Sequence, residues 1–444
     1  MSFDPCKIRT FRFLEPHFHL PTRTLELRYS LDRFGFTEVL SFPAFEANQE
    51  VLNSPALSEA FKAVTLAAGI SYYKAAVPRE VETVGFSVSR KMAGFFEDLY
   101  LHGLGEFAWR NKLDLRGRFK IQDSSAVEQS VSLKLPKRIL APMGGGKDSL
   151  VTAELLRRAG HDLTLIAVGS HPVIAAAAAN TGLPFLQIGR RIDPQLLSLN
   201  SAGAYNGHLP ITAINSFILV AAALLLGFDT IAMSNERSAN VGNLEYLGLP
   251  VNHQYSKGIR FERALRELIR CTITPDLNYF SLLRPLSELS IAERFAKLEQ
   301  YHHAFCSCNT NFRQTPTSAR AWCGQCPKCR FVFLALAPFI SKAKLLSIFQ
   351  HNLLDQPSQL SGFLALLGID SHKPFECVGE FEESAAAVLL LTRSPEWRDS
   401  AVIHGICADP RFSAAVAPDL VQRVLTPSDD HCLTTEYRRY LDAF

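Results

Sequence analysis

The sequence lacks the features that would place this protein on a nucleic acid or inside a membrane. Its 444 residues carry a net charge of only +3, whereas a dedicated nucleic-acid binder needs a strongly basic face. The longest apolar run, residues 211–228, is interrupted by Asn215, Ser216 and Gly227, so it predicts a buried helix and not a membrane span. Residues 1–7 contain no apolar segment typical of a signal peptide. We therefore expect a globular cytoplasmic protein with no nucleic-acid partner and no membrane insertion.

Cysteine is too sparse for the disulfide framework of a small secreted protein, because the chain has only ten. Five of the ten lie between residues 306 and 329. Such clustering in a long chain indicates a metal site in a reducing compartment. Internal repeats and low-complexity tracts are also absent, and the length allows two or three domains. No pattern indicates an oligomeric state.

A glycine turn at residues 144–146 is the most informative feature that is present. It follows a short apolar strand and precedes an amphipathic helix. Gly144, Gly145 and Gly146 let the backbone approach a ligand closely, and their N–H groups can bind an anion at the start of the helix. Lys147 adds a cation for phosphate oxygens. The motif is not a Walker A sequence, because Asp148 follows the lysine.

Strands and helices alternate on both sides of this turn. Predicted strands span 139–143, 163–168, 185–188 and 230–233, and predicted helices span 150–159, 172–180, 210–226 and 261–270. Such alternation predicts a parallel sheet covered by helices on both faces. Ligands bind at the carboxyl ends of such strands, where Val168 and Ser234 lie. We therefore expect the glycine turn, Val168 and Ser234 to surround one ligand.

Two polar stretches, residues 234–243 and 251–258, follow the last of these strands. Polar loops at the ligand end of a sheet commonly carry function. Glu236, His253 and Lys257 are their candidate functional side chains. Solvated connections are the alternative interpretation.

The cysteines at 308, 323, 326 and 329 have the spacing C-x14-C-x2-C-x2-C. This spacing suits tetrahedral Zn²⁺ with four thiolate ligands, and a site with four protein ligands is structural. Cys308, Cys323, Cys326 and Cys329 are therefore the predicted metal ligands, with Cys306 beside the first. An iron–sulfur cluster and free buried cysteines remain alternatives.

The flanking regions complete the predicted α/β architecture. Residues 23–42 predict a β-hairpin turning at Asp32-Arg33, and residues 87–101 predict a helix. Residues 331–444 are predicted to be helical. The predicted organisation is an N-terminal α+β domain (1–135), a parallel-sheet ligand-binding domain (136–300), a cysteine knuckle (301–335) and a helical C-terminal region (336–444).

The motif GGGKDS resembles the SGGxDS pyrophosphate loop of the ATP-pyrophosphatase superfamily, whose HUP-like members split ATP between the α and β phosphates. Together with SNERSANVGN, NHQYSKG and CGQCPKC, it resembles the UDP-N-acetylmuramoyl-L-alanyl-L-glutamate epimerase family of peptidoglycan precursor synthesis. The resemblance implies an ATP- and Mg²⁺-dependent conversion of the terminal L-Glu of UDP-MurNAc-L-Ala-L-Glu to D-Glu, with release of AMP and pyrophosphate.

The resemblance also implies roles for individual residues. Gly144, Gly145, Gly146 and Ser149 would hold the β,γ-diphosphate, and the segment from Val168 would hold adenine. Lys147 would neutralise the leaving pyrophosphate, and Asp148, with Glu236 as a second candidate, would hold Mg²⁺. The base that removes the α-proton stays open among His253, Lys257, Tyr255 and Glu236, with Cys271 a weaker candidate.

Three other functions fit parts of the sequence. An amidating synthase of the same superfamily is one, because 7-cyano-7-deazaguanine synthase has a similar cysteine arrangement beside its pyrophosphate loop. A tRNA-modifying enzyme and a non-catalytic ATP-binding protein are the others. Dependence on ammonium, salt-sensitive tRNA binding and turnover of ATP to AMP distinguish them from an epimerase.

Overall fold

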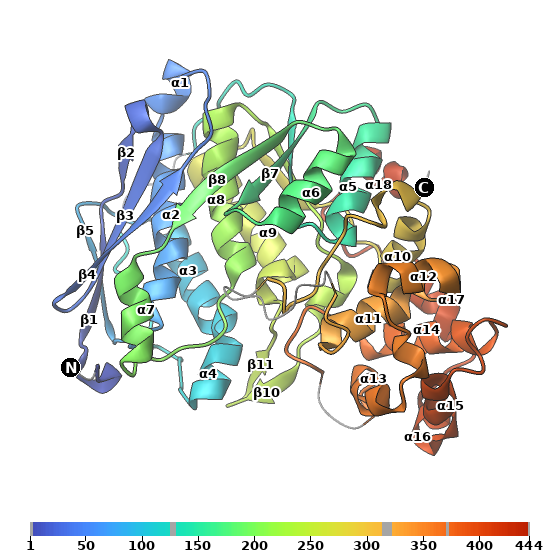
Figure 1. Ribbon diagram of the computed structural model, residues 1–444. Coiled ribbons are helices and arrows are strands. Elements are labelled where there is room, and N and C mark those ends of the chain that lie inside the picture. The colour runs from blue at the N-terminus through green and yellow to red at the C-terminus, as the bar shows by residue number, and fades with distance from the viewer. Residues whose placement is uncertain (1–2, 125–129, 313–321, 370–372, 443–444) are drawn as a thin grey trace.

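The computed structural model describes residues 3–124, 130–312, 322–369 and 373–442. A large sheet occupies the N-terminal and central parts of the chain, and C-terminal helices gather at the opposite side of the molecule (Figure 1). The expectation of an α/β fold is confirmed.

One ten-stranded sheet runs in the order β12-β9-β6-β7-β8-β4-β3-β1-β5, with β2 beside β3. The strands are β1 Thr10–Leu14, β2 His17–His19, β3 Thr24–Leu31, β4 Phe34–Ser41, β5 Glu80–Val84, β6 Ile139–Pro142, β7 Leu163–Val168, β8 Phe185–Arg191, β9 Thr230–Met233 and β12 Asn278–Ser281. Strands β12, β9, β6, β7 and β8 are mutually parallel. The four strands predicted from alternation are therefore confirmed, and the edge strand β12 is an addition to them.

The N-terminal strands continue the parallel sheet directly. Strand β8 pairs antiparallel with β4, with Gly189 opposite Ser41, and β4 forms the predicted hairpin with β3 around Asp32 and Arg33. Asp32 has φ +46°, a conformation that Asp tolerates in tight turns. Residues on both sides of position 135 thus share one sheet, and the domain boundary placed there stays a prediction.

Helices cover both faces of the parallel part. The helices before the cysteine segment are α1 Gln49–Leu52, α2 Pro55–Tyr73, α3 Arg90–Gly103, α4 Gly105–Asn111, α5 Lys147–Arg158, α6 Pro172–Thr181, α7 Pro194–Ser201, α8 Ile211–Leu226, α9 Ile259–Leu268 and α10 Glu288–Ala296. A short hairpin, β10 Leu244–Tyr246 and β11 Leu249–Val251, lies between β9 and α9. The predicted helices are confirmed with shifted ends. Helix α5 begins at Lys147 because Gly146, in an extended conformation, is its N-cap.

The C-terminal region is helical, as predicted. Its helices are α11 Pro327–Leu336, α12 Lys342–Phe349, α13 Leu360–Leu366, α14 Phe381–Thr392, α15 Ala401–Ala408, α16 Pro410–Ala415, α17 Leu420–Leu425 and α18 Thr435–Asp442. Helix α11 begins within the cysteine knuckle, with Cys326 as its N-cap and Cys329 in its first turn, and α10 packs against both α5 and α11. The C-terminal helices therefore reach the helix that follows the glycine loop.

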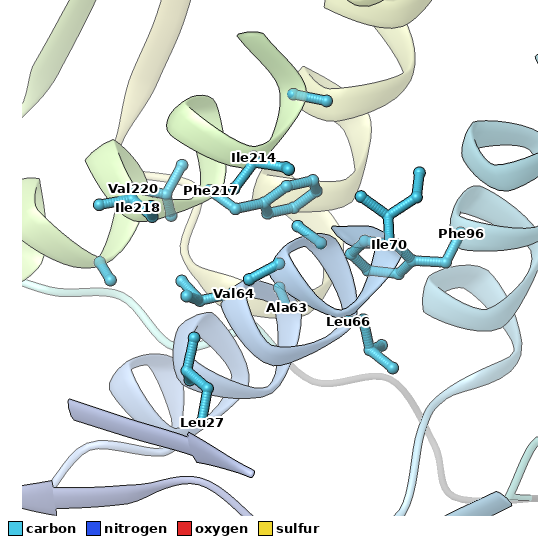
Figure 2. Packing of buried hydrophobic residues seen from close by; sticks show 14 of the residues in the cluster. Leu27, Ala63, Val64, Leu66, Ile70, Phe96, Ile214, Phe217, Ile218 and Val220 are labelled. Carbon is cyan, nitrogen blue, oxygen red and sulfur yellow. The ribbon is translucent and has the colours of Figure 1, made fainter. Parts of the chain in front are cut away.

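The parallel sheet separates two hydrophobic cores because side chains alternate along each strand. In β6, Leu140 points into the core with α2 and α8, whereas Ile139 and Ala141 point into the core with α5, α10 and the C-terminal helices. Figure 2 shows the first core, where Val64 and Ile70 of α2 lie near Ile214 and Phe217 of α8.

The apolar run at 211–228 forms helix α8, whose buried residues include Phe217, Leu219 and Val220. It packs against α2, so the prediction of a buried helix is confirmed. In the part of the chain that the structure describes, no helix is both long enough and apolar enough to cross a membrane.

Candidate active site

A cavity of about 380 Å³ lies at the carboxyl ends of β6, β7 and β9. The connections from β6 and β9 lead to opposite sides of the sheet, and this change of direction leaves a crevice where ligands of α/β proteins bind. Predicted site residues that line it are Gly144, Gly146, Asp148, Ser149, Val168, Ser234, Glu236 and Lys257. The structure thus brings together the three segments that were predicted to meet, and Lys257 joins them from a fourth.

The glycine loop lies at one end of the cavity. Gly145 alone among the three glycines has a positive φ, +78°, and a Cβ added there would lie 3.2 Å from Val173 Cγ1. The Gly144 N–H donates to Ser149 Oγ at 3.4 Å, and that hydroxyl donates to the Gly146 carbonyl at 3.0 Å. The Cys306 N–H donates to the Gly145 carbonyl at 2.9 Å. The start of the cysteine segment therefore holds the loop in place.

Lys147 is buried below the loop, and its ammonium contacts the carboxylates of Asp148 and Glu288. Lys328 contacts the other oxygen of Glu288 at 3.3 Å. Burial would raise the pKa of Glu288, but Lys147 and Lys328 lower it to about 2. Lys147 was predicted to meet phosphate directly; the structure places its ammonium on carboxylates, while Lys328 lines the cavity. Sequence reasoning missed Glu288 and Lys328, because no local pattern identifies them as partners of Lys147.

Ser234 and Glu236, which both line the first cavity, have surroundings that suit a polar ligand. The Ser234 hydroxyl is buried and has no hydrogen-bond partner among the described residues, which is costly unless a ligand completes it. Burial, reinforced by Glu288, raises the pKa of Glu236. The fully buried Arg284 binds the backbone carbonyls of Glu236 and Lys257 and pairs with Glu262 at 2.9 Å. Both polar loops are thereby fixed at the cavity.

A second cavity of about 390 Å³ adjoins the first, since Thr212, Lys257 and Cys377 line both. The Lys257 ammonium lies 3.4 Å from Cys377 Sγ. Burial would raise the pKa of the Cys377 thiol, but Lys257 and a hydrogen bond with His253 lower it to about 6. Sequence reasoning missed Cys377, whose neighbours in the chain give no signal of its environment.

His253, predicted as a candidate base, lies in the second cavity. Its Nδ1 is 2.5 Å from Glu106 Oε2. Burial would lower the pKa of His253, but Cys377 and Glu106 raise it to about 9. At neutral pH His253 is therefore an imidazolium between a carboxylate and a thiol.

His208 and Glu106 complete the surroundings of His253. The His208 ring lies 4.2 Å from the His253 ring, and burial lowers the pKa of His208 to about 4. Ligand atoms of Glu106, His208 and His253 lie within 4.8 Å of one another. However, Arg110 Nε donates to Glu106 Oε1 at 2.6 Å, and a fixed guanidinium disfavours a cation beside it. We therefore interpret the three residues as a hydrogen-bonded group.

Two contacts hold the Cys377 segment against the rest of this group. Asn243 Oδ1 accepts from the His253 N–H at 2.9 Å, and its Nδ2 donates to the Pro374 carbonyl at 3.0 Å. Phe375 stacks on Trp109 with ring centroids 4.9 Å apart. The polar stretch 234–243 thus positions both His253 and Cys377.

The four predicted cysteine ligands come together. The Sγ atoms of Cys308, Cys323, Cys326 and Cys329 lie within 4.8 Å of one another, and Cys323 and Cys329 are 3.7 Å apart. Cys323 Sγ accepts from the Cys326 N–H, and Cys326 Sγ from the Cys329 N–H, both at 3.4 Å. This donor set fits a tetrahedral thiophilic metal. Cys306 lies outside the group of four.

Two other candidate bases lie elsewhere. The Tyr255 hydroxyl donates to Asp98, and Cys271 Sγ donates to Glu267 at 3.0 Å. Neither lines the two cavities described above.

Family models and individual relatives both match most of this chain. The model of the MurL N-terminal domain matches residues 2–282, and that of the MurL C-terminal domain matches residues 304–419. A UDP-N-acetyl-alpha-D-muramoyl-L-alanyl-L-glutamate epimerase from Xanthomonas oryzae is 44% identical over 94% of this chain and 92% of its own. Proteins of the same name from Micromonospora sp. and Salinispora tropica are 41% and 42% identical, over 91% and 90% of this chain and 91% and 88% of their own.

Proposed function

This chain belongs to the MurL family, and on that premise we propose that it is an epimerase. It converts the terminal L-Glu of UDP-MurNAc-L-Ala-L-Glu to D-Glu in peptidoglycan precursor synthesis. The observation that carries this proposal is the 44% identity to an epimerase of that name over 94% of the chain. We further propose that the reaction uses ATP and takes place in the cytoplasm.

The chemistry explains why a nucleotide is needed. Removing a proton beside a carboxylate places a second negative charge on a group that is already charged. Converting the carboxylate to an acyl-adenylate removes the first charge and makes the α-proton more acidic. A side chain of the protein can then remove that proton, and return of a proton to the opposite face inverts the centre. Hydrolysis of the adenylate releases AMP.

The first cavity is the proposed ATP site of a pyrophosphate-loop, HUP-like domain. The glycine loop and Ser149 would bind the β,γ-diphosphate through the start of α5. Val168 would contact adenine, and the Ser234 hydroxyl offers a polar contact to the nucleotide. A ligand on this wall would give that hydroxyl the hydrogen-bond partner that it lacks among the described residues.

The charged cluster beside the loop is suited to the leaving pyrophosphate. Lys328 lines the cavity directly, and Lys147 reaches phosphate if its ammonium leaves Asp148, which then offers oxygen ligands to Mg²⁺ together with Glu236. Bound Mg²⁺ would neutralise phosphate charge during the transfer. Four thiolates would bind structural Zn²⁺, and Cys306 and Lys328 link that segment to the active site.

One incubation tests the proposed function. The protein is mixed with ATP, Mg²⁺ and UDP-MurNAc-L-Ala-L-Glu in D₂O, and the glutamate is analysed for chirality and deuterium at Cα. We expect D-Glu carrying deuterium, together with AMP and pyrophosphate. Orthophosphate in place of pyrophosphate, or glutamate that stays in the L form, would overturn the proposal. An amide formed only when ammonium is added would indicate an amidating synthase.

A further inference from the structure

The two adjoining cavities suggest where the reacting carbon must lie. This step rests on the proposed function. The carboxylate must reach the α-phosphate of ATP in the first cavity, whereas the sugar and alanine must extend away from the nucleotide. Because Cα is one bond from that carboxylate, it must lie close to where the cavities join. Thr212, Lys257 and Cys377 form the wall there.

Of these three residues, Cys377 has the surroundings of an anionic base. The Lys257 ammonium lies 3.4 Å from its sulfur. His253 shares a hydrogen bond with it and binds Glu106 through Nδ1 at 2.5 Å. A cation and an imidazolium held by a carboxylate stabilise a thiolate, which is the reactive form of cysteine. The lowered pKa of Cys377, about 6, agrees with this geometry.

The same contacts explain why His253 is the weaker candidate for the base. An imidazolium has no lone pair available to accept a proton. Lys257 is likewise held as an ammonium, because Cys377 and Glu236 offset its burial and raise its pKa. Of His253, Lys257 and Cys377, Cys377 is the one that its neighbours hold in a proton-accepting form.

We propose that Cys377 is a catalytic residue that removes the α-proton of the activated glutamate. The Cα–H bond breaks, an S–H bond forms, and the electron pair of the broken bond moves into the enolate. Water in the cavity delivers a proton to the opposite face of Cα, and the hydroxide so formed takes the proton from the Cys377 thiol. This step restores both the thiolate and the water molecule.

His253 and Glu106 act as positioning residues in this scheme. Glu106 is fixed by Arg110 at 2.6 Å and orients the His253 ring, so that the other side of the ring faces the thiolate. Asn243 holds the backbone of His253 and of the Cys377 segment together. The Cys377 sulfur and the His253 imidazole are thereby held close together, although the two residues lie 124 positions apart in the chain.

The test compares Cys377→Ser with the wild-type protein in two assays. ATP–pyrophosphate exchange in the presence of UDP-MurNAc-L-Ala-L-Glu reports adenylation, and deuterium uptake at Cα with D-Glu formation reports proton transfer. We expect Cys377→Ser to lose at least about 100-fold in deuterium uptake and D-Glu formation while exchange stays within tenfold. Cys407→Ser, which replaces an exposed thiol on α15, is the matched control with both activities retained.

The outcomes separate this inference from the proposed function. D-Glu formation by Cys377→Ser within threefold of wild type would overturn the role of Cys377 alone. If the wild-type protein forms neither AMP nor D-Glu, both the proposed function and the role of Cys377 are overturned. As a second measurement on the native fold, iodoacetamide is applied to wild type and the modified cysteines are identified by mass spectrometry. Epimerisation should fall in step with alkylation of Cys377, and full activity with Cys377 alkylated would also overturn the role.

Discussion

Two groups of cysteines in this protein are built in opposite ways. The four-thiol group uses residues between 308 and 329, whose sulfurs contact one another, backbone N–H groups and the Thr310 hydroxyl. The Cys377 group places one thiol among Lys257, His253 and Glu106, which come from two other segments. The first arrangement suits binding of a metal, and the second suits control of a proton. Loss of the first should therefore reduce stability, and loss of the second should reduce activity.

The largest effect is expected from breaking the four-thiol group. Cys329→Ser removes a buried ligand, and the free energy of metal binding is part of the folding free energy in such sites. We expect loss of bound zinc and a decrease of more than about 4 kcal/mol in the free energy of unfolding. Metal analysis and thermal unfolding measure both, with Cys377→Ser and Cys407→Ser as controls. Wild-type protein that contains no bound zinc, or a Cys329→Ser variant that melts at the same temperature as wild type, would contradict this prediction.

The cluster around Glu288 comes next, because it joins the glycine loop to the cysteine segment. Lys147→Met should reduce ATP–pyrophosphate exchange by about 10²–10³-fold, the usual cost of losing one group that stabilises developing charge. It also leaves Lys328 as the one remaining ion-pair partner of Glu288 among the described residues. The double variant Lys147→Met/Glu288→Gln removes that imbalance and should recover stability but not exchange. Lys7→Met, at an exposed lysine, serves as the control; exchange by Lys147→Met at the wild-type rate would rule out the role of Lys147.

The Cys377 group predicts a bell-shaped pH dependence of D-Glu formation. Below about pH 6 the thiol gains a proton and cannot accept another. Above about pH 9 His253 loses the proton that stabilises the thiolate. Lys257 and Lys328 also face the thiol and lower its pKa, and Lys373 lies near it. We expect kcat/KM to fall about tenfold per pH unit outside these limits.

ATP–pyrophosphate exchange should not follow the same curve, because adenylation does not require the thiolate. Glu106→Gln should lower the upper limit of the bell, since His253 then loses the carboxylate that raises its pKa. If D-Glu formation by Glu106→Gln falls above the same pH as in wild type, a group other than His253 causes the loss of activity at high pH.

The smallest effect is expected at the glycine loop. Gly145→Ala places a Cβ at φ +78°, 3.2 Å from Val173 Cγ1, and such a conformation costs about 1–2 kcal/mol for a residue with a side chain. We expect a matching loss of stability and a higher KM for ATP. Gly160→Ala, at φ +77° and with open space around its Cβ, carries the same strain away from the cavity. Its KM for ATP should equal that of wild type, and an equal rise in both variants would contradict the prediction.

Local patterns in the sequence were sufficient for features whose residues are close together in the chain. The glycine turn, the four strands that follow one another and the four clustered cysteines were predicted because spacing alone constrains them. The meeting of Ser234 with the glycine loop also followed, since parallel strands end at one edge of the sheet. The 19-residue helix α2 was missed because it is buried on nearly every side, so no polar face marks its period.

The local sequence thus determined the order of the helices and strands, the conformation of the glycine loop and the clustering of the four cysteines. The tertiary structure alone decided which charges meet: it placed Glu288 between Lys147 and Lys328, and Cys377 between Lys257 and His253. The physical reason is that protonation and ion pairing depend on burial and on charges a few ångströms away. Those neighbours come from distant segments, and only the packed sheet and helices bring them together.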